Sequence, residues 1–282
     1  MVITLATAAF AAPFTFGGQF EIDGAHVVQA SSAACTYAIL MGGGAACPED
    51  NAEAELTTRG RLPSSKKGGR LIVTAIPTHL STAASQARDN CGAADAATEA
   101  SHQVSYSATG VANAVTAQGA IVVSHLGKAT ETDTRGSTPA PNCRVHANGD
   151  STNDTSGDVT IRIPFTIAPN AGGTFALSLQ AANIGENTDF TWNYLKVTAS
   201  AGPLSCEVDV SGRSMDSCLQ ASTLEEGAYT MTVTVEHSSG MTVDSEANPG
   251  ELHVVNDLFT AQVVPVARAT TSTDLAMPTA AK

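Results

Sequence analysis

The stretch that decides the fold is Val159-Thr-Ile-Arg-Ile-Pro-Phe-Thr-Ile167, followed after a Pro/Gly segment by Thr174-Phe-Ala-Leu-Ser-Leu-Gln-Ala181. In both runs apolar side chains occupy every second position, which is the period of a strand with one buried face. The segment between them is rich in residues that favour turns, so the sequence predicts an antiparallel hairpin with a loop longer than two residues. Pro164 lies on the polar phase and lacks a ladder donor, which favours an edge position or a bulge.

Further alternating runs, separated by Gly, Asn, Asp and Pro turns, extend this pattern along the chain. They include Arg70–Pro77, His102–Ala108 and Tyr229–Glu236. Turn signals at roughly 8–12-residue spacing are typical of a sandwich. We therefore expect an all-β fold, an antiparallel β-sandwich of jelly-roll or immunoglobulin-like type, with disulfide-stapled loops and little helix. Ser81 to Ala100, rich in Ala, Gln, Arg and Glu, is the best helix candidate.

The domain organisation follows from changes in composition along the chain. Residues 13–268 are expected to form the sandwich, as one domain or as two lobes divided near 130–158, where Pro, Gly, Asp and Asn indicate a surface loop or linker. Residues 1–12 are apolar and small like a signal peptide but lack its basic start, so they are either that or an N-terminal assembly strand. Residues 269–282 are expected to be a flexible tail.

Composition excludes several classes of partner. Only 5% of the residues are aromatic, and the net charge is −13. Nucleic acids and anionic membranes are bound through clustered Lys and Arg, so we expect neither as a partner. No apolar run reaches the ~18 residues that a membrane span needs.

The six cysteines indicate disulfides and an oxidising compartment. They show neither a Cys-x-x-Cys motif nor zinc-like Cys/His spacing. Of the fifteen possible pairings, equal spacing favours Cys35 with Cys47 and Cys206 with Cys218, which leaves Cys91 for Cys143. We therefore expect a protein that is secreted or held at the cell surface.

Catalytic motifs are not found in the sequence. It holds no G-x-S-x-G, H-E-x-x-H, Walker A or G-x-G-x-x-G pattern, so we predict a protein without enzymatic activity. Among the seven histidines, His102 and His125 could meet across a sheet as a metal or acid–base pair. The interpretation that we favour is ordinary histidines near strand ends.

Asp150, Asp154 and Asp158 form the densest acidic cluster. Carboxylate oxygens on a bending loop are the ligands that calcium prefers, although this register does not match an EF-hand. The alternative is a solvated turn. Calcium is thus the one cofactor that the sequence suggests.

Phe190, Trp192 and Tyr194 alternate along a strand. Such a stripe either faces the core or forms a platform on which sugars stack. The apolar residues after Tyr194 have the opposite phase, which predicts a bulge or bend near that residue.

The Ala/Ser/Thr-rich strands from His102 to Leu126, together with the two opening runs, resemble the sandwich body of exported bacterial proteins of the PEP-CTERM type. The Pro-Glu-Pro motif of that group is not found after Val266. The resemblance implies an exported surface or matrix protein with no assigned catalysis.

We therefore predict a non-enzymatic structural protein of the cell surface, the extracellular matrix or a filament. It would self-assemble by strand addition, with Val2 to Phe16 as the candidate donor. The alternative is a carbohydrate-binding module that uses Trp192. The corresponding partners are further copies of the chain or a surface polysaccharide.

Overall fold

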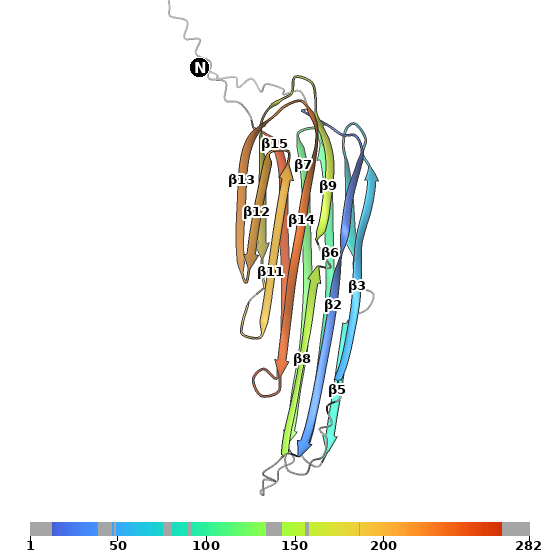
Figure 1. Cartoon of the computed structure of the whole chain (residues 1–282), viewed down its shortest axis with the longest axis vertical. Helices are drawn as coiled ribbons and strands as arrows, with labels where there is room; N and C mark the ends of the chain where they lie inside the picture. Colours follow the sequence, from blue (N-terminus) through green and yellow to red (C-terminus); the bar gives the residue numbers. More distant parts are fainter. Residues whose placement is uncertain are drawn as a thin grey trace, which may run out of the picture.

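The computed structural model describes residues 13–38, 47, 49–75, 81–89, 92–133, 143–155, 158–185 and 187–266. Within these ranges the protein is a long, narrow sandwich of two antiparallel sheets (Figure 1), which confirms the predicted fold class. The described ranges contain no helix that is long and apolar enough to cross a membrane.

Each sheet combines strands from both halves of the chain. The eight-stranded sheet contains β1 (Phe14–Thr15), β2 (Gln19–Ala38), β3 (Glu49–Pro63), β8 (Cys143–Thr155), β9 (Val159–Ile167), β11 (Thr191–Ala201), β12 (Leu204–Ser211) and β14 (Gly227–Asp244). The seven-stranded sheet contains β4 (Gly69–Ala75), β5 (Ser81–Asp89), β6 (Gly92–Val111), β7 (Ala114–Asp133), β10 (Gly173–Asn183), β13 (Ser214–Leu224) and β15 (Gly250–Pro265).

The molecule is long because, at one position in each sheet, two shorter strands lie end to end beside a long strand. β9 and β8 both pair with β2 and β14, and they follow each other along one strand position. In the other sheet β4 and β5 share the side of β6 in the same way. β12 and β13, in contrast, reach only the upper part of the molecule as drawn in Figure 1.

The predicted hairpin between the two opening runs is wrong. β9 lies in the eight-stranded sheet and β10 in the seven-stranded sheet, so the turn between them crosses from one layer to the other. Their buried faces meet through Phe14, whose ring centroid lies 5.2 Å from that of Phe165 and 5.5 Å from that of Phe175. Period-2 alternation shows only that each strand has one buried face. Two such strands can pair edge to edge in one sheet, or they can lie in different sheets with their buried faces in contact.

Pro164 lies inside the sheet, so the predicted edge position is wrong. The alternative prediction is a bulge, and the structure shows that the ladder is interrupted on one side of this residue. On one side β9 pairs continuously with β14. On the other side β1 pairs with Thr166 and Ile167 and β2 with residues 160–162, while residues 16–18 leave the ladder opposite Pro164. The missing N–H of proline is tolerated because the ladder is interrupted there.

Two further predictions are wrong. Ser81 to Ala100 forms β5 and the first part of β6 instead of a helix, and these strands pair from Ser81↔Ala100 to Asp89↔Gly92. Alanine has a strong helix propensity, but cross-strand pairing and burial override it here. The loop predicted over residues 130–158 is also wrong for Cys143–Thr155, which is the internal strand β8.

The interior is divided into two apolar regions by a polar layer. The larger region, between the upper parts of the sheets, includes Phe20, Tyr106, Phe165 and Phe175. The smaller region is mostly alanine and consists of Ala34, Ala94, Ala96, Ala129, Val145, Ala147, Met241 and Val243. The side chains of the smaller region are thus short compared with the aromatic rings that fill the larger one.

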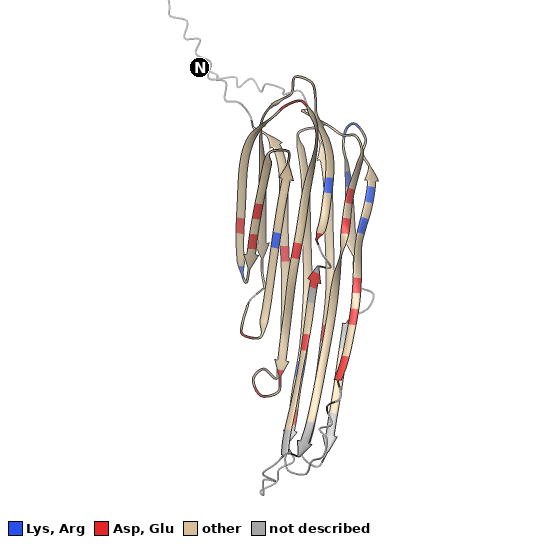
Figure 2. Cartoon of the chain, in the orientation of Figure 1, with Lys and Arg blue, Asp and Glu red and all other residues tan. Residues whose placement is uncertain are grey.

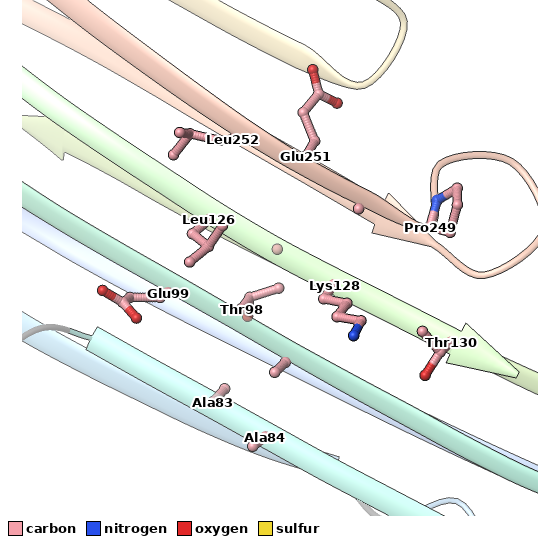
Figure 3. Close-up of a pocket in the computed structure, with 13 residues that line it drawn as sticks. Ala83, Ala84, Thr98, Glu99, Leu126, Lys128, Thr130, Pro249, Glu251 and Leu252 are labelled. Atoms are coloured by element: carbon pink, nitrogen blue, oxygen red, sulfur yellow. The ribbon is translucent and has the colours of Figure 1, made fainter.

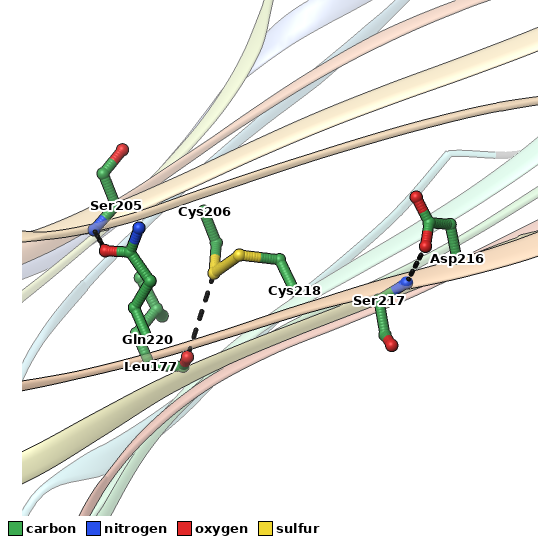
Figure 4. The surroundings of a disulfide bond; sticks show 7 residues. All are labelled: Leu177, Ser205, Cys206, Asp216, Ser217, Cys218 and Gln220. Atoms are coloured by element: carbon green, nitrogen blue, oxygen red, sulfur yellow. Dashed lines mark hydrogen bonds between the residues drawn. A yellow bond between two sulfur atoms is a disulfide. The ribbon is translucent and has the colours of Figure 1, made fainter.

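Two of the predicted disulfides are present. Cys35 is bonded to Cys47, and Cys206 of β12 is bonded to Cys218 of β13 (Figure 4), with 5.6 Å between the Cα atoms of the second pair. The second bond joins the edge strands of the two sheets. Cys91 lies outside the described residues, as do residues 1–12 and 269–282, so the third pair stays a prediction.

Candidate functional site

Trp192 and Tyr194 lie on the outer face of β11, and Phe190 lies directly before this strand, so the core alternative is wrong for the two strand residues. Thr191, Asn193 and Leu195 point inward, while Trp192 is 38% exposed. Its indole lies against Gly240 of β14, where a Cβ atom would collide with the ring. The predicted bulge near Tyr194 is also wrong, because β11 pairs without interruption with β14. The inward-facing positions of β11 begin with the polar residues Thr191 and Asn193, and the aromatic residues occupy the outward-facing positions.

The three aspartates are not gathered around one point. Asp150 and Asp154 lie on β8, four residues and therefore about 13 Å apart along the strand. Asp150 accepts a hydrogen bond from the Thr242 hydroxyl at 2.7 Å, and Asp158 lies just before β9. Among the described residues, no group of three or more His, Cys, Asp or Glu side chains could hold a metal ion. The geometry thus gives calcium no support at this segment.

The polar layer inside the sandwich is a belt of histidines. Five of the seven histidines are buried between the sheets, and we call them the histidine belt: His26, His102, His125, His237 and His253. They lie within strands, so the prediction of strand-end positions for His102 and His125 is wrong. The sequence contains a signal for this arrangement, because His102 shares its phase with Val104 and His125 shares its phase with Val123.

Members of the belt contact one another and other polar side chains. Nε2 of His26 lies 2.9 Å from the Tyr106 hydroxyl, and its ring centroid is 5.3 Å from that of His102. The His125 ring lies between two serine hydroxyls, Ser151 and Ser239, each 3.0 Å from a ring nitrogen.

An aspartate completes this layer. Nε2 of His237 lies 3.1 Å from Oδ2 of Asp257, close enough for an ion pair although not aligned as a hydrogen bond. The belt therefore connects both sheets, since His26 and His237 belong to one and His102, His125 and His253 to the other.

Burial lowers the pKa of four of the five histidines in the belt. The pKa of His102 is lowered to about 4 and that of His125 to about 3, in each case mainly by desolvation and in addition by neighbouring histidines. The pKa of His26 is lowered as well, mainly by burial. Neither ring nitrogen of His102 has a hydrogen-bond partner. A positive charge on the His102 ring would therefore lack a hydrogen-bond acceptor, and its protonation would destabilise the folded protein.

A shallow groove of about 710 Å³ lies over β5, β6, β7 and the start of β15 (Figure 3). Leu126 and Leu252 contribute apolar surface, and Glu99, Lys128 and Glu251 are charged groups on its walls. Its described lining residues include no His, Cys or Ser. Ser–His and Cys–His pairs are therefore absent from the described lining of this groove.

The lateral edges of the sandwich differ from each other. We call β12 and β13 the acidic edge, because Glu207, Asp209 and Asp216 are exposed on it. We call the adjoining ends of β3 and β4, together with the turn between them, the basic edge. It carries Arg59, Arg61, Lys66, Lys67 and Arg70. Figure 2 shows the two edges on opposite sides of the molecule.

β13 is the least protected of these strands. Within the described part of the chain it pairs only with β10. It carries one charged residue, Asp216, and its Met215 and Leu219 side chains are 79% and 73% exposed. A free row of backbone donors and acceptors with apolar side chains is a template for another strand.

Comparison with known proteins gives little further information. No protein-family model matches the chain, and no curated protein matches it. A crystal structure of an exo-β-1,3-galactanase from Phanerochaete chrysosporium with β-1,3-galactotriose aligns at 9% identity over 74% of this chain and 89% of that chain, with a TM-score of 0.16. A likeness this low carries no argument about the activity of this chain.

Proposed function

We propose that this protein is an exported, non-enzymatic structural protein of the cell surface, the extracellular matrix or a filament, and that its copies join by strand addition. The observation that carries the proposal is the edge strand β13, which combines an unpaired backbone with exposed Met215 and Leu219. Strand addition uses such an edge for main-chain hydrogen bonds and uses its side chains for specificity.

Two other edge strands, β12 and β3, are better protected than β13. β12 carries Glu207 and Asp209 within eight residues, and β3 carries charged side chains along most of its length. Charged side chains at an edge oppose pairing with another chain, because a new strand would desolvate them. The lack of such charges on β13 supports a strand that pairs in the assembled protein.

The disulfides support export. They form and persist in oxidising compartments such as the cell exterior, and Cys35–Cys47 and Cys206–Cys218 are both bonded. The resemblance to exported surface proteins points in the same direction. The sequence predicts a donor strand over Val2 to Phe16. Phe14 and Phe16 are buried in the core of their own chain, so only residues 1–12 of this segment stay candidates for the donor.

Assembly is tested by sedimentation velocity and negative-stain electron microscopy of the oxidised protein over a range of concentrations. Leu219→Lys places a charge on β13, and we expect it to raise the concentration needed for assembly about tenfold, equivalent to about 1.4 kcal/mol. Leu258→Lys is the matched control, because Leu258 is 41% exposed on β15 and pairs with Ala182 of β10 on one side and with Ala120 of β7 on the other. A wild-type protein that stays monomeric at all concentrations contradicts the proposal.

The exposure of Trp192 favours carbohydrate binding as a second candidate function. Aromatic rings at a surface bind sugars by stacking, and the outward position of this indole on β11 permits such contact. Titration of the protein with a panel of glycans tests this function, because Trp192 is the only tryptophan and reports binding by its fluorescence. Unchanged emission across the panel, with no binding by calorimetry, contradicts it.

A further inference from the structure

The two outer strands at the upper end of the seven-stranded sheet run in opposite directions. Going from β13 to β4, the chain makes five successive antiparallel pairings, through β10, β15, β7 and β6. An odd number of reversals leaves β13 antiparallel to β4. If a second copy is placed beside the first in the same orientation, β13 of one copy therefore meets β4 of the other as an antiparallel neighbour.

The same two strands lie at the same level. Following paired residues across the sheet, Thr74 of β4 is in one row with Met215 of β13. That row consists of Thr74, Ser105, Ala120, Leu258, Ala182 and Met215. By the same rule Gly69 is level with Gln220 and Ala75 with Ser214. The whole length of β4 is thus matched by residues of β13 without a shift along the strands.

β4 shares the exposed apolar character of β13. Within the described residues it pairs only with β6, its Ile72 side chain is 52% exposed, and Arg70 is its one charged residue. β13 carries one charge of the opposite sign, Asp216. Neither strand has the closely spaced charges that protect β12 and β3, so these two edges are suited to each other.

Charges on the other sheet are complementary at the same level. Arg59 of β3 shares a row with Glu207 of β12, and Arg61 shares a row with Ser205. Within one copy Arg59 forms an exposed ion pair with Asp23 at 2.7 Å, and the exposed carboxylate of Glu207 pairs with Lys196 at 3.2 Å. Exposed pairs are weak and can exchange partners.

We propose that the acidic edge of one copy binds the basic edge of a second copy, and that β13 and β4 pair as antiparallel strands across this contact. The proposal rests on the proposed function, since it names the partner and the geometry of strand addition. The seven-stranded sheet carries the backbone pairing, because β13 and β4 have one charged residue each, whereas β12 has two within eight residues and β3 is charged along most of its length. The eight-stranded sheet contributes the complementary charges.

This contact leaves both ends of the assembly open. The two surfaces that meet are different, so each added copy presents the same free edge again, and such heterologous contacts give filaments unless the rotation between copies closes a ring. The right-handed twist of strands adds a rotation at every step. A twisted filament or ribbon with strands across its axis is the expected product.

Cysteine cross-linking tests the geometry directly. Thr74→Cys and Met215→Cys are made in separate proteins, mixed at concentrations where the protein assembles and treated with a mild oxidant. The two positions share a row but lie five strand spacings, roughly 24 Å, apart within one copy, so only contact between copies can join them. We expect a covalent dimer from the mixture, and a ladder of multimers from the double variant.

The control pairs Thr74→Cys with Leu258→Cys, which is exposed in the same row but lies on the internal strand β15. A yield no higher than that of this control overturns the edge-to-edge contact. If electron microscopy still shows assemblies in that sample, the proposed function survives without this contact. A cross-link from Ala6→Cys to Met215→Cys would then identify residues 1–12 as the donor. Absence of any assembly contradicts both proposals.

Discussion

Acidification should destabilise the protein through the histidine belt, and His102 gives the sharpest test. Its pKa is lowered from 6.5 to about 4 by burial, so the unfolded chain binds a proton at this residue before the folded protein does. Stability therefore falls as the pH decreases below about 6.5, and the loss continues until the pH reaches the folded pKa near 4. Above pH 6.5 His102 is neutral in the folded and the unfolded state, so its protonation no longer changes the free energy of unfolding.

The magnitude follows from the two pKa values. Between pH 7 and pH 4.5 a group with pKa 6.5 in the unfolded state and about 4 in the folded state lowers the free energy of unfolding by roughly 2 to 3 kcal/mol. His125, with a folded pKa of about 3, contributes a similar loss. Together they remove about 5 kcal/mol, a large fraction of the 5–15 kcal/mol that is typical of a folded domain.

His102→Phe isolates the contribution of one ring. Phenylalanine keeps a planar ring, cannot be protonated, and removes two ring nitrogens that have no hydrogen-bond partner. We expect unchanged or higher stability at pH 7 and roughly 2 to 3 kcal/mol less destabilisation than the wild type at pH 4.5. The control is Gln103→Asn on the exposed face of the same strand, which should keep the full acid dependence.

The assay is urea denaturation at a series of pH values, followed by Trp192 fluorescence and by circular dichroism. A wild-type free energy of unfolding that is constant from pH 7 to pH 4.5 would refute the reasoning. A His102→Phe variant whose acid dependence equals that of the wild type would refute the part assigned to this residue.

Three other changes have defined outcomes. Replacing both Cys206 and Cys218 by alanine should lower the free energy of unfolding by about 3 kcal/mol in urea denaturation, and an unchanged midpoint would show that this bond does not constrain the unfolded chain. Gly240→Ala should displace the Trp192 indole and shift its emission to longer wavelength, because a Cβ atom would collide with the ring; identical emission spectra would contradict the packing of the ring on β14. Calcium should not change the melting temperature relative to a chelator, since Asp150 and its acidic neighbours are not gathered together; a clear rise would show a site that this geometry does not explain.

Much of the architecture could be predicted from local patterns. Alternation in Val159–Ile167 and in Thr174–Ala181 identified two strands and their buried faces, and equal cysteine spacing identified two disulfides. The pairing of the two strands could not be predicted in this way. Whether two neighbouring strands pair or stack depends on where the turn leads the chain, and the alternation is identical in both cases.

The candidate sites were harder to predict, because exposure depends on the sheet around a strand. Trp192 looked like a core residue by its size, yet the small Gly240 beside it makes room for the ring on the outer face. His102 looked like an isolated polar residue, yet strands from the other sheet bring His26 and His237 toward it. These contacts join residues that are far apart in the chain, so no local spacing reveals them.

Amide hydrogen exchange of β13 tests the central claim most directly. The account predicts that the backbone N–H groups of residues 214–224 exchange quickly in the dispersed protein, except those bonded to β10, and that the remainder become protected on assembly. Protection should appear at the same time over Gly69–Ala75 of β4. Assemblies in which β13 exchanges as quickly as in the monomer would contradict strand addition at this edge.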